Sequence, residues 1–249
     1  MSESYRAIVS SDWNECLAPT GPFEPISFNY PELTSELEAV FQDYTGNVIT
    51  LGEANQRIQK LLARPLSIGQ MDAYLDQSFV TYKGVFDLIE WCLSNNILFM
   101  INTTGMMGFF QRVFAKGLLP PVPVLSAHPM IRYPHLETDP HYLYDLLQLQ
   151  DKGKNTEAVM QKLGISPSKV FIIGDSGGDG PHFKWGSDQG AFLIGSMTKP
   201  SLKMYCQDNG IPINLQFGLS YIQGEKRNSE KEMSIDFMEL SSIIEEALK

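Results

Sequence analysis

Two short apolar runs, far apart in the chain, each lead into aspartate. Ile8–Ser11 precedes Asp12, and Val170–Ile173 precedes a glycine, Asp175 and, four residues later, Asp179. Apolar runs of this length are typical of buried strands in a parallel sheet. Ligands of open α/β sheets gather at the carboxyl ends of such strands. If the two strands are neighbours, the three aspartates converge on one point.

Carboxylates that converge in this way repel each other unless a cation lies between them. Oxygen ligands of this kind suit a hard divalent cation such as Mg²⁺. The tight turn between Asp175 and Asp179 is allowed by the two glycines at 177–178. The sequence therefore predicts a magnesium site at this edge of the sheet.

Two further motifs lie between these runs. Asn-Thr-Thr-Gly at 102–105 follows the apolar run Ile97–Ile101, and Lys-Gly-Lys occupies 152–154. Together the four motifs resemble, in order and spacing, those of the haloacid dehalogenase (HAD) superfamily, which consists mostly of Mg²⁺-dependent phosphotransferases. The resemblance covers most of the chain and implies an α/β fold, a Rossmann-like parallel sheet flanked by helices.

The resemblance also implies a nucleophile and a set of metal ligands. Asp12 would attack phosphorus and form an aspartyl phosphate, which water then hydrolyses. The Mg²⁺ ligands would be Asp12, the backbone carbonyl of Asn14, Asp175, and Asp179 either directly or through water.

The middle two motifs would hold the phosphoryl group. Thr103 would donate its hydroxyl to a phosphate oxygen, assisted by Thr104, Gly105 and the N–H groups at the start of the next helix. Thr104 is the alternative in register. Lys152 would neutralise the phosphoryl group and Asp12 together, with Lys154 as its alternative.

One position departs from the superfamily pattern. The second aspartate of the first motif, the general acid/base, is Asn14 here, and an amide cannot carry a proton to a leaving group. General acid/base groups typically contribute roughly 10²–10⁴-fold to a rate. Glu15 and His182 are alternative acids. Asn14 would also fit a phosphatase whose substrate has a good leaving group, or a protein that binds a phosphorylated ligand without turnover.

A mostly helical insert is predicted between the first two motifs. Pro19, Gly21, Pro22 and Pro25 interrupt the chain after the first strand, and helical spacing of apolar residues follows in three segments, at 32–44, 54–62 and 67–76. We therefore expect a HAD-like core of residues 1–18 and 84–249 and a helical cap of residues 19–83. The insert resembles the cap of the phosphoserine phosphatase-like branch. A cap excludes water and shapes the choice of substrate.

Elsewhere the pattern is weaker. The proline-rich stretch 120–125 predicts an edge strand or a loop. Residues 223–232 are polar and predict a flexible loop, and residues 234–248 predict a closing helix.

Charge and composition limit the partners. The net charge of −10 argues against a protein that binds nucleic acid, which would need a basic face. No apolar run approaches the ~20 residues of a membrane span, and the polar N-terminus lacks the features of a signal peptide. Three scattered cysteines favour a reducing, cytoplasmic setting.

These observations favour a Mg²⁺-dependent phosphatase, a phosphomonoester hydrolase acting on a small phosphorylated metabolite. The alternative is a HAD-like protein that binds a phosphorylated ligand without turnover, because of Asn14. Dehalogenation or phosphonate cleavage is a third hypothesis. The complete acidic loop argues against a metal-free dehalogenase, and no cap lysine for phosphonate cleavage is identifiable. Neither the substrate nor the oligomeric state is predicted.

Overall fold

A sheet of seven parallel strands forms the centre of the molecule. The computed structural model describes residues 5–45 and 48–249, and its strand order is β4-β3-β2-β1-β5-β6-β7. This confirms the α/β class expected from the sequence. The strands are β1 (Ala7–Ser11), β2 (Ile97–Met106), β3 (Val124–His128), β4 (Tyr142–Asp145), β5 (Val170–Gly174), β6 (Phe192–Thr198) and β7 (Leu215–Ser220).

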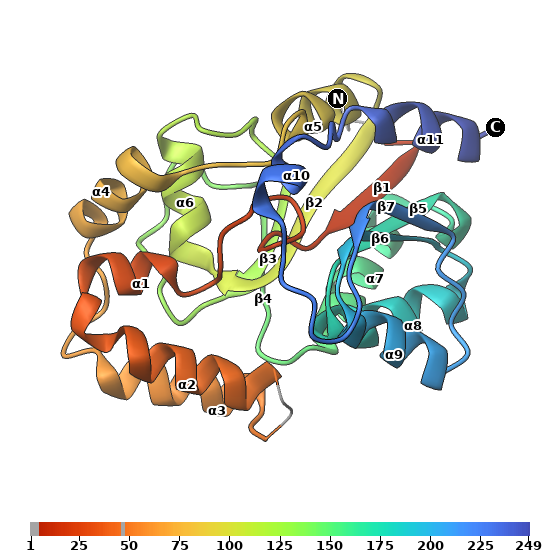
Figure 1. Cartoon of the computed structure of the whole chain (residues 1–249). Helices are drawn as coiled ribbons and strands as arrows, with labels where there is room; N and C mark the ends of the chain where they lie inside the picture. Colours follow the sequence, from red (N-terminus) through yellow and green to blue (C-terminus); the bar gives the residue numbers. More distant parts are fainter. Residues whose placement is uncertain (1–4, 46–47) are drawn as a thin grey trace.

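The two faces of the sheet are both covered, because its strands carry apolar residues on both sides. Val9 of β1 contributes to one apolar core, and its neighbour Ile8 to the other. On the first face lie α5 (Val85–Ser94), α6 (Met107–Ala115) and α11 (Glu239–Ala247), and on the second lie α7 (Asp151–Leu163), α8 (Gly180–Gln189) and α9 (Pro200–Asp208). Figure 1 shows the two helical layers on either side of the strands.

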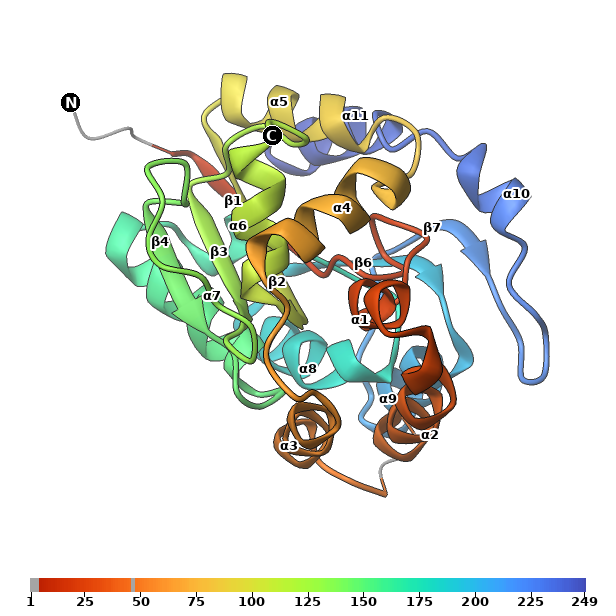
Figure 2. The ribbon, with the colours of Figure 1, turned by 90° about the vertical axis from the view of Figure 1, so that its left-hand side faces the viewer.

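Four helices between β1 and α5 lie apart from the sheet. They occupy the left of Figure 1 and face the viewer in Figure 2. Their bounds are α1 (Glu24–Asn29), α2 (Thr34–Thr45), α3 (Leu51–Leu61) and α4 (Ile68–Ser78), with a 3-10 turn at Pro31–Leu33.

The helices α3 and α4 begin with reciprocal side-chain caps. Thr50 and Glu53 cap the start of α3, and Ser67 and Gln70 cap the start of α4. Such caps satisfy backbone N–H groups that have no partner within the helix. The helical character of the insert agrees with the sequence prediction, while the division into a core and a cap domain stays a prediction.

Residues 120–123 of the proline-rich stretch form a loop, one of the two predicted alternatives, and residues 124–125 begin β3, which is internal rather than at an edge. β3 is fully buried and pairs with β2 on one side and β4 on the other. The edge position falls to β4, whose side chains are partly exposed. Within the described residues, no helix is both long and apolar enough to cross a membrane.

The polar stretch at 223–232 is a loop only in part. Residues 223–228 form neither helix nor strand, as expected, whereas the rest of the stretch forms most of α10 (Ser229–Met233). Glu232 is buried, accepts hydrogen bonds from Tyr82 and Tyr221, and forms an ion pair with Arg227. A buried carboxylate is stable only when it is paired and hydrogen-bonded in this way.

The chain that follows α10 contacts the point where the insert ends. Phe237 donates its N–H to the carbonyl of Lys83 at 2.8 Å, and its ring stacks on Tyr82 with centroids 5.7 Å apart. Tyr82 in turn donates its N–H to the carbonyl of Leu17 at 3.0 Å. The two connections between the insert and the sheet therefore lie side by side, held by residues near 237.

Candidate active site

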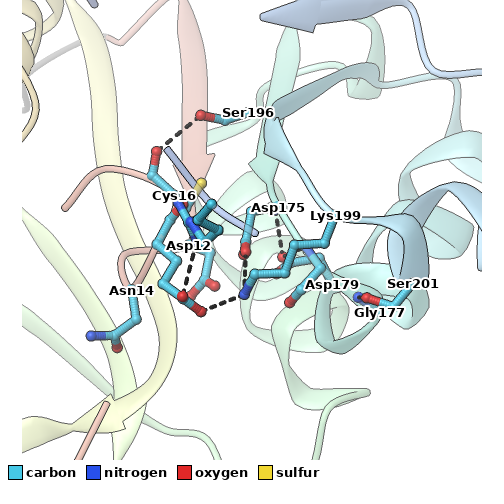
Figure 3. A network of polar contacts seen from close by, with 12 residues as sticks. Asp12, Asn14, Cys16, Asp175, Gly177, Asp179, Ser196, Lys199 and Ser201 are labelled. Atoms are coloured by element: carbon cyan, nitrogen blue, oxygen red, sulfur yellow. Dashed lines mark hydrogen bonds and ion pairs between the residues drawn. The ribbon is translucent and has the colours of Figure 1, made fainter. Parts of the chain in front are cut away.

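The carboxyl ends of β1 and β5 bring the predicted aspartates together. The two strands are neighbours, with Ser11 opposite Ile173, and Asp12 donates its N–H to the carbonyl of Ile173 at 2.9 Å. The carboxylates of Asp12, Asp175 and Asp179 are all buried, with one oxygen of each within 4.8 Å of the others (Figure 3).

The loop after β5 folds back so that Asp179 points toward the strand end. Its Oδ2 accepts hydrogen bonds from the N–H groups of Asp175 at 2.9 Å and Ser176 at 3.3 Å. Gly174 allows this close return, because a Cβ at that position would lie 2.6 Å from Cγ of Asp179. The turn from Asp175 to Asp179 therefore requires glycine at position 174.

Lys152 lies between two of the carboxylates. It is on α7 with its side chain 1% exposed, and its Nζ lies 3.1 Å from Oδ1 of Asp12 and 2.6 Å from Oδ1 of Asp179. Burial lowers the pKa of Lys152, but the two carboxylates outweigh this and raise it overall. The alternative, Lys154, is 70% exposed and, among the residues that the structure describes, forms its ion pair with Asp151 of its own helix. Lys152 is thus the lysine that reaches the cluster.

The electrostatics of the cluster differ from one carboxylate to the next. Burial raises the pKa of Asp12, although the charge of Lys152 opposes the rise. Burial also raises the pKa of Asp175, to about 7, against the lowering effect of Lys199. For Asp179 the effect of burial is outweighed by Lys152 and by the two backbone donors, so its pKa is lowered. Burial therefore favours the protonated form of Asp12 and Asp175, whereas Asp179 is stabilised as a carboxylate.

A divalent cation fits this donor set. Oδ1 of Asp12 and Oδ2 of Asp175 are buried, and each is contacted by one lysine ammonium group, that of Lys152 at 3.1 Å and that of Lys199 at 2.9 Å. A carboxylate oxygen has more than one acceptor site, so each can take a further ligand. Together with Asp179 these oxygens offer the hard ligands that such a cation prefers.

A second lysine neutralises the outer side of the cluster. Nζ of Lys199, at the start of α9, lies 2.9 Å from Oδ2 of Asp175 (Figure 3). It also pairs with the carboxylate of Glu15. Glu15 has a positive φ of 58°, an uncommon conformation for a residue with a side chain. Arg227 holds it by an ion pair at 3.0 Å and by a hydrogen bond to its carbonyl.

The second motif, residues 102–105, lies toward the end of β2, on the other side of β1 from β5. Thr103 is buried, and its hydroxyl accepts a hydrogen bond from the N–H of Gly105 at 3.1 Å. Thr104 is half-buried and is hydrogen-bonded to the side chain of Tyr44 from α2. The next helix, α6, begins at Met107, so its first N–H groups also lie near this strand end.

Asn14 is turned away from the acidic cluster, as Figure 3 shows. Its Nδ2 donates to the carbonyl of Thr20 at 3.1 Å, and a Cβ added to Gly105 would lie 3.0 Å from its Oδ1. It lines a small cavity with residues of the insert and of α6, among them Tyr74 and Phe110. Its side chain therefore faces the insert.

The other acids considered from the sequence are engaged elsewhere. His182 is fully buried on α8 and contacts the hydroxyl of Thr156 at 3.0 Å. Burial lowers the pKa of His182 to about 3, so the ring is neutral. Glu15 is held in its ion pairs with Lys199 and Arg227.

Comparison with known proteins supports the fold. No protein-family model matches the chain, and no curated protein matches it in sequence. Among solved structures, a phospho-aspartyl intermediate analogue of phosphoserine phosphatase is 14% identical, with a TM-score of 0.66 over 96% of this chain and 99% of that chain. A substrate-bound phosphoserine phosphatase complex gives the same identity and TM-score over 96% and 98% of the two chains.

A HAD family hydrolase from Salmonella enterica subsp. enterica serovar Typhi is also similar. It is 14% identical, with a TM-score of 0.64 over 86% of this chain and 68% of that chain. At these identities the likeness concerns the fold. The chain has the fold of the HAD hydrolases, in the form found in phosphoserine phosphatases, as the sequence motifs indicated.

Three groups at the site were given no role from the sequence. Asn102, part of the motif at 102–105, is buried, and its amide donates to Ser10, to Thr156 and to the carbonyl of Lys152. Lys199 and Tyr44 enter from α9 and α2. Asn102 is the first polar residue after the apolar run of β2, which is a signal that could have identified it. For Lys199 and Tyr44 the sequence offers no comparable signal.

Proposed function

We propose that the protein is a Mg²⁺-dependent phosphomonoester hydrolase that acts on a small phosphorylated metabolite through an aspartyl-phosphate intermediate. The observation that carries the proposal is the meeting of Asp12, Lys152, Asp175 and Asp179 at one edge of the sheet, where the neighbouring strand β2 carries Thr103. A nucleophile, a buried counter-charge and a hydroxyl donor are the parts that phosphoryl transfer needs.

The residues divide the reaction between them. A carboxylate oxygen of Asp12 attacks phosphorus, and Lys152 neutralises charge on the transferred group from its position 3.1 Å away. Thr103 donates its hydroxyl to one phosphoryl oxygen. The N–H groups at 104–105 and at the start of α6 donate to the other phosphoryl oxygens. Bound Mg²⁺, held by Asp12, Asp175, Asp179 and the carbonyl of Asn14, supplies charge neutralisation for the phosphoryl oxygens. Water then releases phosphate and restores Asp12.

Phosphate release from a panel of phosphomonoesters tests the proposal. Asp12→Asn keeps the shape of the side chain but removes the nucleophile, so we expect release to fall to background. Asp188→Asn, an exposed change on α8 in a surface ion pair with Lys184, is the control and should keep full activity. Substantial turnover by Asp12→Asn would refute the mechanism.

A second candidate function is binding of a phosphorylated ligand without turnover. Asn14 favours it, because its amide supplies no proton. In that case the wild type would bind inorganic phosphate in a Mg²⁺-dependent way and release none from any ester, while Asn14→Asp would gain activity. Robust hydrolysis by the wild type excludes this alternative.

A further inference from the structure

A tyrosine from the insert lies across the phosphoryl-binding end of the sheet. Tyr44, near the end of α2, is hydrogen-bonded to the side chain of Thr104 in the last part of β2. A Cβ placed on Gly178, in the turn after β5, would lie 3.7 Å from the Tyr44 hydroxyl. Because β1 lies between β2 and β5 in the sheet, this hydroxyl lies between the two motifs that flank Asp12.

The position of the hydroxyl matches the side from which a leaving group departs. In phosphoryl transfer the attacking and leaving oxygens are roughly in line through phosphorus. Asp12 attacks from the strand end, so the leaving oxygen points away from the sheet, toward the helices of the insert. Tyr44 belongs to that layer, is hydrogen-bonded to Thr104 on one side of Asp12, and has its hydroxyl near Gly178 on the other side.

We propose that the Tyr44 phenol is the proton donor to the leaving group, in the role that the Asn14 amide cannot fill. This rests on the proposed phosphatase function. The other acids near the site are engaged: Glu15 is paired with Lys199 and Arg227, and His182 is buried against Thr156.

Tyr44 loses a proton in the first step of the reaction and regains one in the second. In the first, an oxygen of Asp12 forms a bond to phosphorus and the ester P–O bond breaks. Its electron pair stays on the leaving oxygen, which takes the Tyr44 proton. In the second, water attacks phosphorus and gives its proton to the Tyr44 phenolate, while the bond between Asp12 and phosphorus breaks. Alcohol and phosphate leave, and both side chains return to their starting forms.

The environment of Tyr44 suits this exchange. Burial raises the pKa of the phenol to about 12, with Lys152 opposing the rise. The group therefore holds its proton at neutral pH and gives it up only to a strong base. An alkoxide leaving group is such a base, whereas 4-nitrophenolate leaves without a proton.

The test compares two esters of similar shape, benzyl phosphate and 4-nitrophenyl phosphate. General acid catalysis contributes roughly 10²–10⁴-fold, so we expect Tyr44→Phe to lower kcat/KM for benzyl phosphate by about 100-fold or more. For 4-nitrophenyl phosphate the loss should stay below about tenfold, since no proton is needed. Tyr30→Phe is the matched control, because Tyr30 is a tyrosine of the same insert whose hydroxyl contacts Gln70. It should leave both rates unchanged.

A rescue experiment separates proton donation from a structural role. Adding Asn14→Asp to Tyr44→Phe places a carboxylic acid at the first motif, and benzyl phosphate hydrolysis should recover. Equal losses on the two esters, no loss on either, or a wild type active only on 4-nitrophenyl phosphate would each overturn the role of Tyr44. A wild type inactive on every ester would overturn the phosphatase proposal itself, and the role of Tyr44 with it.

Discussion

Replacing Lys152 by methionine should destabilise the fold through the charges that it leaves behind. Methionine keeps most of the apolar stem and removes the ammonium group that lies 3.1 Å from Asp12 and 2.6 Å from Asp179. Breaking a buried ion pair from one side typically costs about 3–5 kcal/mol, because the remaining charge is buried without compensation. Here two carboxylates remain, so we expect a loss at the upper end of that range.

Lys154→Met is the matched control, two residues away on the same helix. That lysine is 70% exposed and pairs with Asp151 at 3.0 Å. Exposed pairs of this kind contribute at most about 1 kcal/mol. Urea unfolding at neutral pH, followed by far-UV circular dichroism, measures both free energies of unfolding.

The same urea unfolding experiment with added Mg²⁺ tests why Lys152→Met loses stability. A cation that binds only the folded state stabilises it by about 2.7 kcal/mol at a hundred times its dissociation constant. Lys152→Met leaves more uncompensated charge at the site, so Mg²⁺ should stabilise it more than the wild type. Equal stability of the two lysine variants, or an effect of Mg²⁺ no larger in Lys152→Met than in the wild type, would refute the reasoning.

Two further perturbations probe the surroundings of the site. Lys199→Met removes the cation that lies 2.9 Å from Asp175, so calorimetric titration should show tighter Mg²⁺ binding, whereas Lys203→Met, one turn along α9, should not change it. Burial lowers the pKa of His182 to about 3, below its unfolded value of about 6.5. The unfolded state therefore binds the proton first, and stability is full above about pH 6.5 and falls toward pH 3 by up to about 1.4 kcal/mol per pH unit. Urea unfolding across that range should show a shallower fall in His182→Gln and an unchanged one in the exposed control His135→Gln.

The motif-bearing strands were predictable because burial on both faces requires a continuous apolar run. β1, β2 and β5 have such runs, each followed by polar residues. The edge strands β4 and β7 have half-exposed patterns, and their sequences carry no comparable signal. The meeting of the aspartates followed from one assumption, that β1 and β5 are neighbours.

The side chains that surround the aspartates were harder to predict. Lys152 and Lys154 fit the motif equally well by type, and the phase of α7 turns one inward and the other outward. Tyr44 depends on how the insert lies over the sheet, which helical spacing alone does not specify. The pairing of Arg227 with Glu15 joins residues 212 positions apart. The polar composition of residues 223–232 gives no sign of this pairing.

That pairing bears on the order in which the molecule is assembled. Closing a long loop costs conformational entropy before any contact repays it, so distant contacts form late. The loop after β1 is among the first segments of the given sequence, yet both partners of its strained residue Glu15, Lys199 and Arg227, lie more than 180 positions later. The parallel sheet can therefore pair while the nucleophile loop is still unformed. On this view the strands can be paired before the loop that carries Asp12 has its final shape.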